Sequence, residues 1–149
     1  MPDRLPRILV IGLLAAAAAA PALRCQQTAR PNVIVIITDD QGWGDIGYHN
    51  PAVYSPNLDA LARSGARFTQ HYVMPQCTPT RVAVMTGRYP SRFGPQAQQA
   101  NNAKAFPLGT PTLGTLMKSA GYETHLVGKW HLGTSTEHGP TKFGFDHSY

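Results

Sequence analysis

The sequence predicts an α/β fold in which a mainly parallel sheet is flanked by helices. The first observation is NVIVIITDD at residues 32–40, an unbroken β-branched apolar run that is typical of a strand buried on both faces. The second is the alternation of strand candidates with short helical segments that begin beside Pro and end at Gly. The composition agrees with a globular domain, because 42% of the 149 residues are hydrophobic and 14% are charged.

Two further segments have the composition of strands. They are ARFTQHYV at 66–73 and YETHLVGK at 122–129. The stretch between 89 and 109 is rich in Pro, Gly, Asn and Gln, so we expect a long surface loop there. Everything after Gly133 is also expected to be loop.

Each predicted helix starts at a capping residue followed by proline and stops at a glycine. The third helix carries an apolar stripe that we expect to be buried, formed by Leu113, Leu116, Met117 and Ala120. The predicted helices cover 56–64, 78–86 and 111–120, with Ser55, Thr78 and Thr110 as caps and Gly65, Gly87 and Gly121 as their ends.

The first 22 residues have the features of a secretory signal peptide. Arg4 and Arg7 precede the apolar run ILVIGLLAAAAAA, and Ala-Pro-Ala follows at 20–22. We therefore expect residues 1–22 to be removed, residues 23–30 to form a short linker, and the protein to be periplasmic or secreted. The run is too short and too rich in Ala for a stable membrane span. Arg24 disfavours a lipid anchor at Cys25, since a small residue is expected before a lipidated cysteine.

The net charge of +5 is spread along the chain without a run of basic residues, which argues against nucleic acid as a partner. The chain has two cysteines, Cys25 and Cys77. A disulfide between them is one interpretation for an exported protein. The other is that Cys77 remains a thiol with a separate role, because Cys25 lies in the N-terminal tail.

Groups able to do chemistry follow all three predicted strands. Asp39 and Asp40 end the first, Cys77 follows the second, and Lys129 and His131 follow the third. In parallel α/β sheets such groups meet beyond the carboxyl ends of the strands. We therefore expect them to converge on one crevice.

Each group also has a simpler interpretation. The two adjacent carboxylates suit Ca²⁺ or Mg²⁺, but also a solvated turn. A cysteine at a helix start, with Arg81 one turn further on, suits an anion, but is also compatible with a buried structural cysteine. Lys129 and His131, two residues apart, can point the same way in an extended segment, although this pattern is also common on surfaces.

The string C-x-P-x-R at 77–81, with its sequel MTGRYPSRFG, resembles the signature of the type I sulfatases. This is the formylglycine-dependent arylsulfatase family of the alkaline phosphatase superfamily. The family's opening segments are similar, in the same order, to PNVIVIITDDQGWGDIG, SPNLDALARSGARFTQHYV, SAGYETHLVGKWHLG and the final FGFDHSY. One departure is Thr80, where the family more often has serine. The resemblance implies an alkaline-phosphatase-like sheet, with residues 31–149 as the N-terminal part of a longer catalytic domain.

The resemblance implies a sulfuric ester hydrolase that releases sulfate from a carbohydrate or aryl sulfate. A formylglycine-generating or equivalent maturing enzyme would oxidise Cys77 to formylglycine, whose hydrate is the family's nucleophile. Asp39, Asp40 and Cys77 would bind Ca²⁺, in preference to Mg²⁺. Arg81 would hold the formylglycine, Lys129 would bridge it to the sulfate, and His131 would accept a proton. The family's other metal ligands and sulfate-binding residues lie beyond position 149.

Two other functions stay open. The chain could be a truncated, non-catalytic exported protein that binds anions, and sequence supplying the missing ligands would argue against this. It could also be a phosphonate or phosphate-ester hydrolase of the same superfamily, which a comparison of matched sulfate and phosphate esters would distinguish.

Overall fold

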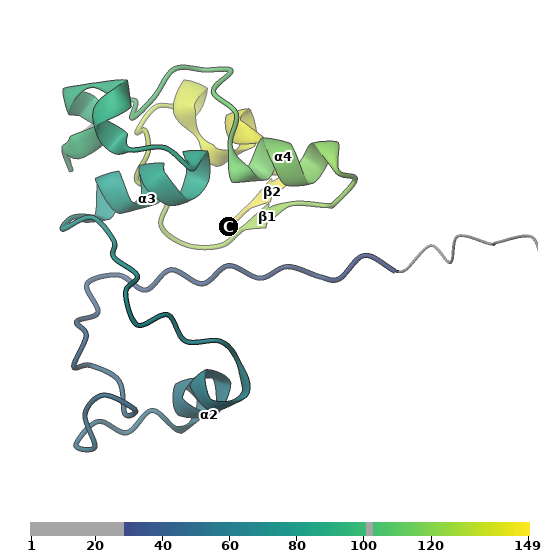
Figure 1. The fold of residues 1–149 in the computed structure, drawn as a ribbon. Coiled ribbons are helices and arrows are strands. Elements are labelled where there is room, and N and C mark those ends of the chain that lie inside the picture. The colour runs from purple at the N-terminus through teal and green to yellow at the C-terminus, as the bar shows by residue number, and fades with distance from the viewer. Residues whose placement is uncertain (1–28, 101–102) are drawn as a thin grey trace, which may run out of the picture. The chain divides into compact units, whose positions relative to one another are not determined.

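The computed structural model describes residues 29–100 and 103–149, and Figure 1 shows their path. The chain divides into two units, residues 1–36 and residues 37–149. In the first unit, residues 29–36 belong to no helix or strand. The predicted signal peptide (1–22), most of the linker and Cys25 lie outside the described residues.

Short helices make up most of the regular structure in the second unit. None of the helices in the described ranges is both long and apolar enough to cross a membrane. The α-helices are α2 (Pro56–Ser64), α3 (Cys77–Thr86) and α4 (Leu113–Ser119), and the 3₁₀ helices are η1 (Pro90–Phe93), η2 (Pro95–Gln98), η3 (Thr136–His138) and η4 (Pro140–Phe143).

The three predicted helices are present, but two of the predicted caps are wrong. The helix α3 begins one residue early, at Cys77, so Thr78 lies inside its first turn and Gln76 is the N-cap. The N-cap of α4 is Thr112 rather than Thr110. The hydroxyl oxygen of Thr112 accepts a hydrogen bond from the backbone amide of Thr115, which is one of the two hydrogen bonds of a capping box. Gly87 ends α3 in the left-handed conformation, with φ of +65°, as its residue type favours.

One parallel strand pair is found in the described chain. It joins β1 (His125–Leu126) and β2 (His147–Ser148), with His125 opposite His147. β1 confirms the centre of the predicted strand at 122–129. β2 corrects the prediction that everything after Gly133 is loop, because the backbone amide of Tyr149 donates to Leu126 (3.0 Å) and holds the last residues beside β1.

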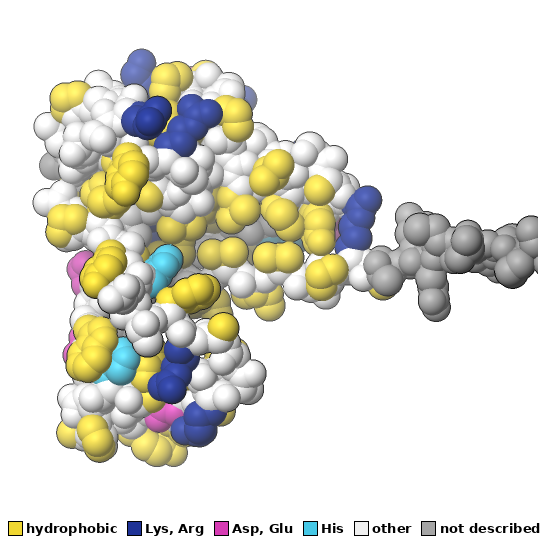
Figure 2. Space-filling model, viewed as in Figure 1, with side chains coloured by type: hydrophobic (Ala, Val, Ile, Leu, Met, Phe, Trp, Pro, Cys, Tyr) yellow, Lys and Arg dark blue, Asp and Glu magenta, His cyan; other side chains and the backbone are white. Residues whose placement is uncertain are grey.

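The predicted strands at 32–40 and 66–73 are wrong for this structure. Neither segment pairs with a strand among the described residues, and their apolar side chains are exposed: Ile34 to 83% and Phe68 to 80%. A β-branched run forms a strand only where a neighbouring strand accepts its backbone hydrogen bonds. Figure 2 shows many such hydrophobic side chains on the visible surface.

The core lies where α3, the segment before α4 and residues 126–143 pack together. Phe106 and Phe143 meet edge to face at its centre, with ring centroids 5.0 Å apart. Phe106 and Ala97 come from the stretch predicted to be a surface loop, which is therefore wrong for these residues: their apolar side chains fill the core. The buried core residues are Val82, Met85, Ala97, Ala105, Phe106, Leu126, Trp130, Leu132 and Phe143.

The predicted buried stripe of α4 is confirmed only in part. Leu113 is half-buried and packs against the core, and Met117 is half-buried, but Leu116 and Ala120 are exposed. Leu116 is 65% exposed, and Gly114 is the buried residue of the helix. A β-carbon at Gly114 would lie 2.6 Å from the carbonyl oxygen of Phe143, so the helix approaches η4 through its backbone. This close approach, rather than the apolar periodicity, decides which face of α4 is buried.

Candidate functional site

The first turn of α3 carries the C-x-P-x-R string. Cys77 is the first helical residue, a half-buried free thiol, and Arg81 lies one turn further on, where it is buried. The side chain of Gln76 does not cap the helix. Instead its carbonyl oxygen accepts from the hydroxyl of Thr80 at 2.8 Å, which ties this turn together.

Residues 129–132 are fixed by alternate burial. Trp130 and Leu132 are buried in the core, whereas Lys129 is exposed and His131 is half-buried. The indole N–H of Trp130 donates to the carbonyl of His138 at 2.8 Å, which fixes the orientation of its ring. The core thus anchors every second residue and leaves the side chains of Lys129 and His131 outside it.

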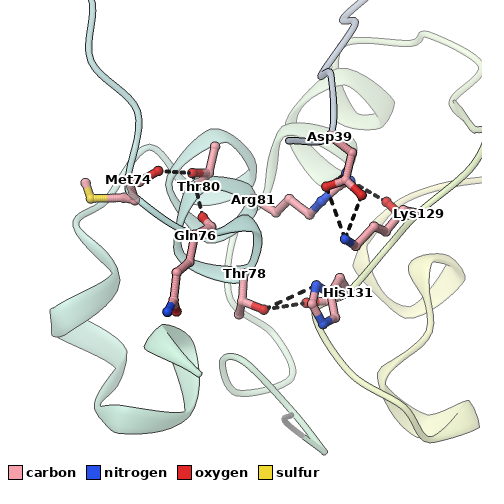
Figure 3. A network of polar contacts seen from close by, with 8 residues as sticks. All are labelled: Asp39, Met74, Gln76, Thr78, Thr80, Arg81, Lys129 and His131. Carbon is pink, nitrogen blue, oxygen red and sulfur yellow. Dashed lines mark hydrogen bonds and ion pairs between the residues drawn. The ribbon is translucent and has the colours of Figure 1, made fainter. Parts of the chain in front are cut away.

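Two contacts hold α3 against this segment, as Figure 3 shows. Arg81 donates from Nη1 to the carbonyl oxygen of Lys129, and Thr78 Oγ1 lies 3.5 Å from both the carbonyl oxygen and Nδ1 of His131. Thr78 is completely buried. The sequence analysis did not predict that Thr78 lies beside His131. The position of Thr78 inside the C-x-P-x-R string was the one feature that could have pointed to it.

Asp39 completes the cluster from a distant part of the chain. Its carboxylate accepts two hydrogen bonds from Lys129 Nζ, at 2.8 and 3.1 Å, and Oδ1 lies 3.7 Å from Arg81 Nη2 (Figure 3). The structure therefore brings together Asp39, Arg81 and Lys129, three of the six residues singled out from the sequence.

The cluster is electrostatically coupled. The hydrogen bond from Lys129 lowers the pKa of Asp39, and the positive charges of Lys129 and Arg81 lower it further. The same hydrogen bond raises the pKa of Lys129, and an electrostatic interaction with Cys77 raises it further. The thiol of Cys77 thus lies within electrostatic reach of the Lys129 ammonium.

Asp40 stands apart from this network. It has no hydrogen bond or ion pair within the described chain. Its φ of +56° and that of His131, +58°, are the two left-handed values at non-glycine residues in the ranges described. Such conformations cost free energy and gather at functional sites.

The described residues do not by themselves complete a divalent-cation site here. Carboxylate oxygens of Asp39 and Asp40 are the right donor type for Ca²⁺ or Mg²⁺, which take six or more oxygens. However, ligand atoms of Asp39, Asp40 and Cys77 do not all lie within 4.8 Å of one another, and Asp39 is paired with Lys129. More oxygen ligands and a release of Lys129 would be needed.

The cluster is instead suited to an anion. Arg81 and Lys129 supply two positive charges near the start of α3. The side chain of Gln76, the N-cap, accepts no hydrogen bond from the first turn of this helix, and helix N-termini favour anions. Arg81 Nε is buried without a hydrogen-bond partner among the described residues. Because buried donors are nearly always hydrogen-bonded, we expect a bound group to accept a hydrogen bond from this nitrogen.

Comparisons with known proteins agree on one family. The Sulfatase family pattern matches residues 31–149. The chain is 43% identical to mouse arylsulfatase J over 122 residues, covering 80% of this chain and 20% of that protein. It is 39% identical to rat N-acetylgalactosamine-6-sulfatase over 153 residues, covering 95% of this chain and 28% of that protein.

Solved structures show the same likeness. The PsFucS1 sulfatase from Pseudoalteromonas sp. matches 98% of this chain and 29% of its own, with a TM-score of 0.68 and 34% identity. The structure of Ps i-CgsB matches 81% of this chain and 28% of its own, with a TM-score of 0.73 and 37% identity.

This chain belongs to the sulfatase family. The similarity to solved sulfatases confirms the α/β, alkaline-phosphatase-like fold class predicted from the sequence. The chain spans between a fifth and three tenths of the length of the relatives named above. Sulfatases as a family hydrolyse sulfate esters and use a formylglycine and a divalent metal.

Proposed function

We propose that this chain is the nucleophile-bearing part of a sulfuric ester hydrolase. The proposal rests on one observation. The cysteine of the C-x-P-x-R string is the first residue of α3, and Arg81 and Lys129 both form ion pairs with Asp39. A sulfate ester presents an anion to this cluster, and the two cations stabilise the negative charge that grows on its oxygens.

Each residue has a role in the proposal. Cys77 becomes formylglycine through a separate maturing enzyme, and this group supplies the nucleophile. Arg81, buried and anchored on the backbone of Lys129, keeps position 77 in place. Lys129 binds the sulfate, and His131 holds and moves a proton, with Thr78 orienting its ring.

The remaining parts of the proposal rest on family membership. Asp39 and Asp40, with ligands from other residues, would hold Ca²⁺ in preference to Mg²⁺, and the metal would neutralise charge on the sulfate oxygens. A carbohydrate or aryl sulfate is the proposed substrate. Export to the periplasm or cell exterior follows from the signal-peptide pattern of residues 1–22.

Modification of Cys77 is the most direct test. The chain is co-expressed with a formylglycine-generating enzyme, and the peptide containing Cys77 is analysed by mass spectrometry and with an aldehyde-reactive hydrazide. We expect conversion at Cys77 and none at Cys25, an internal control that lacks the C-x-P-x-R context. An unmodified Cys77 beside an efficiently converted reference peptide would contradict the proposal.

Hydrolysis is tested in protein expressed from the complete reading frame. We expect Cys77→Ala to abolish sulfate release from an aryl sulfate, and Lys129→Ala or His131→Ala to lower kcat/KM by roughly 10²-fold. Exposed Lys142→Ala serves as the matched control. Faster turnover of the matching aryl phosphate would instead favour a phosphate-ester hydrolase.

A further inference from the structure

A second cluster of chemically active side chains lies on the strand pair, where the proposed hydrolase function does not use it. Within the described ranges, Glu123, His125 and His147 are the one group of three potential metal ligands with one ligand atom each, all within 4.8 Å of one another. All three residues are exposed. None of them belongs to the network of Asp39, Arg81 and Lys129.

The backbone determines this grouping. β1 and β2 run parallel, and their register places His125 directly opposite His147. Side chains opposite each other on paired strands lie on the same face, and the two imidazole rings stack with centroids 4.6 Å apart and planes at 24°. Glu123 is two residues before His125, so its side chain reaches the same face.

The distances suit a small divalent ion. Glu123 Oε1 lies 3.1 Å from His147 Nε2 and 3.4 Å from His125 Nε2. With metal–ligand bonds of about 2.1 Å, the edge of a tetrahedral Zn²⁺ site is roughly 3.4 Å. Both Nε2 atoms already face one carboxylate oxygen. All three ligand atoms lie within 4.8 Å of one another, on exposed side chains.

We propose that Glu123, His125 and His147 form a binding site for a divalent transition-metal ion of the Zn²⁺ type. Two imidazoles and one carboxylate select such ions over Ca²⁺ and Mg²⁺, which prefer sites built from oxygen. The exposed fourth position is left to water. Since its ligands come from β1, β2 and the residues before β1, the ion cross-links the strand pair.

The proposal is tested on the full chain in which both cysteines are replaced, Cys25→Ser and Cys77→Ser, so that no thiolate competes. Zn²⁺ binding is measured by calorimetry at neutral pH, and Co²⁺ serves as a spectroscopic probe of coordination. We expect one Zn²⁺ per chain and Co²⁺ absorption of the tetrahedral type without thiolate bands. A rise in Tm on adding Zn²⁺ would show that the ion cross-links the strands.

Single substitutions identify the ligands. Removing an outer-shell group that hydrogen-bonds to a metal ligand typically costs about 10- to 100-fold in affinity. His125 and His147 are proposed as direct ligands, so His125→Ala or His147→Ala should raise the Kd for Zn²⁺ by about 100-fold or more. Glu123→Gln keeps the size of the side chain and should weaken binding as well. The matched control is His71→Ala, another exposed histidine, which should change nothing.

Three results would overturn the proposal. They are no Zn²⁺ bound to the parent chain, equal Kd values in the parent and in His147→Ala, or an octahedral Co²⁺ spectrum that the histidine substitutions leave unaltered. Because the site shares no residue with the proposed hydrolase site, failure here leaves the Cys77 modification test unaffected. Far-ultraviolet circular dichroism of each variant confirms that the exposed substitutions preserve folding.

Discussion

Asp39 is the residue on which the two cations of the candidate site meet. Its carboxylate binds Lys129 at 2.8 Å and approaches Arg81 at 3.7 Å, so its ionised form is favoured in the folded chain. A carboxyl whose pKa is lower in the folded state stabilises the fold above its unfolded pKa. That contribution is lost as the pH falls through the folded pKa.

The first prediction concerns this ion pair. Replacing Lys129 with Met removes the hydrogen bond that chiefly lowers the pKa of Asp39, so that pKa should rise toward its ordinary value. A carbon-detected NMR titration of the Asp39 carboxyl measures the change. Lys142→Met, at an exposed position away from Asp39, should leave the titration unchanged. An unshifted Asp39 in Lys129→Met would show that the pair does not form in solution.

At the scale of elements, α4 is held to η4 through backbone contact. The hydroxyl of Thr112, the N-cap of α4, donates to the carbonyl oxygen of Phe143 at 2.6 Å while it also caps the helix. Gly144, at φ +91°, lies so close to α4 that a β-carbon there would meet Thr115 N at 2.2 Å. Glycine is therefore needed both at position 114 in α4 and at position 144.

The second prediction tests the contact. Gly114→Ala places a methyl group 2.6 Å from the carbonyl of Phe143, so it should lower the free energy of unfolding by about 1–3 kcal/mol despite the better helix propensity of alanine. Urea denaturation measures it. Gly44→Ala, where a β-carbon meets no atom within 4 Å, should be close to neutral. Equal midpoints for the two variants would contradict the close approach.

Across the second unit, Asp146 links segments that are distant in sequence. It binds Lys118 of α4 at 2.5 Å, and Oδ2 accepts from both the backbone amide (3.1 Å) and the hydroxyl (2.9 Å) of Thr124. The hydrogen bond from Lys118 and those from Thr124 lower the pKa of Asp146 from its ordinary value of 3.8 to about 2. This carboxylate therefore ties α4 and the start of β1 to the C-terminal segment.

The third prediction follows from that pKa. Asp146→Asn removes the ion pair, so the variant should be less stable than the parent at neutral pH. Because the folded pKa is lowered, the difference should be fully present above pH 4 and shrink as the pH falls toward 2. Thermal unfolding across this pH range measures it. Glu137→Gln, at an exposed position of η3, should show no such pH-dependent difference from the parent.

Local interactions explain why the helices could be predicted and most strands could not. Each helix forms hydrogen bonds within its own segment, so Pro56 and Gly87 mark boundaries that the structure confirms. A strand needs partners from elsewhere in the chain. The run at 33–36 has none among the described residues, and β2 forms in a segment without a strand pattern because Tyr149 bonds to Leu126.

In the candidate site too, the local features could be predicted from the sequence and the long-range contacts could not. The sequence by itself determined the family, from motifs along residues 31–149. It also placed Cys77 beside the start of α3 and one turn before Arg81, because these features depend on residues close together in the chain. Only the tertiary structure decided that Lys129 meets Asp39, 90 residues away, and that Thr78 lies against His131. Those contacts depend on the burial of Trp130 and Leu132 beside α3, and core packing is a property of the whole unit rather than of any local pattern.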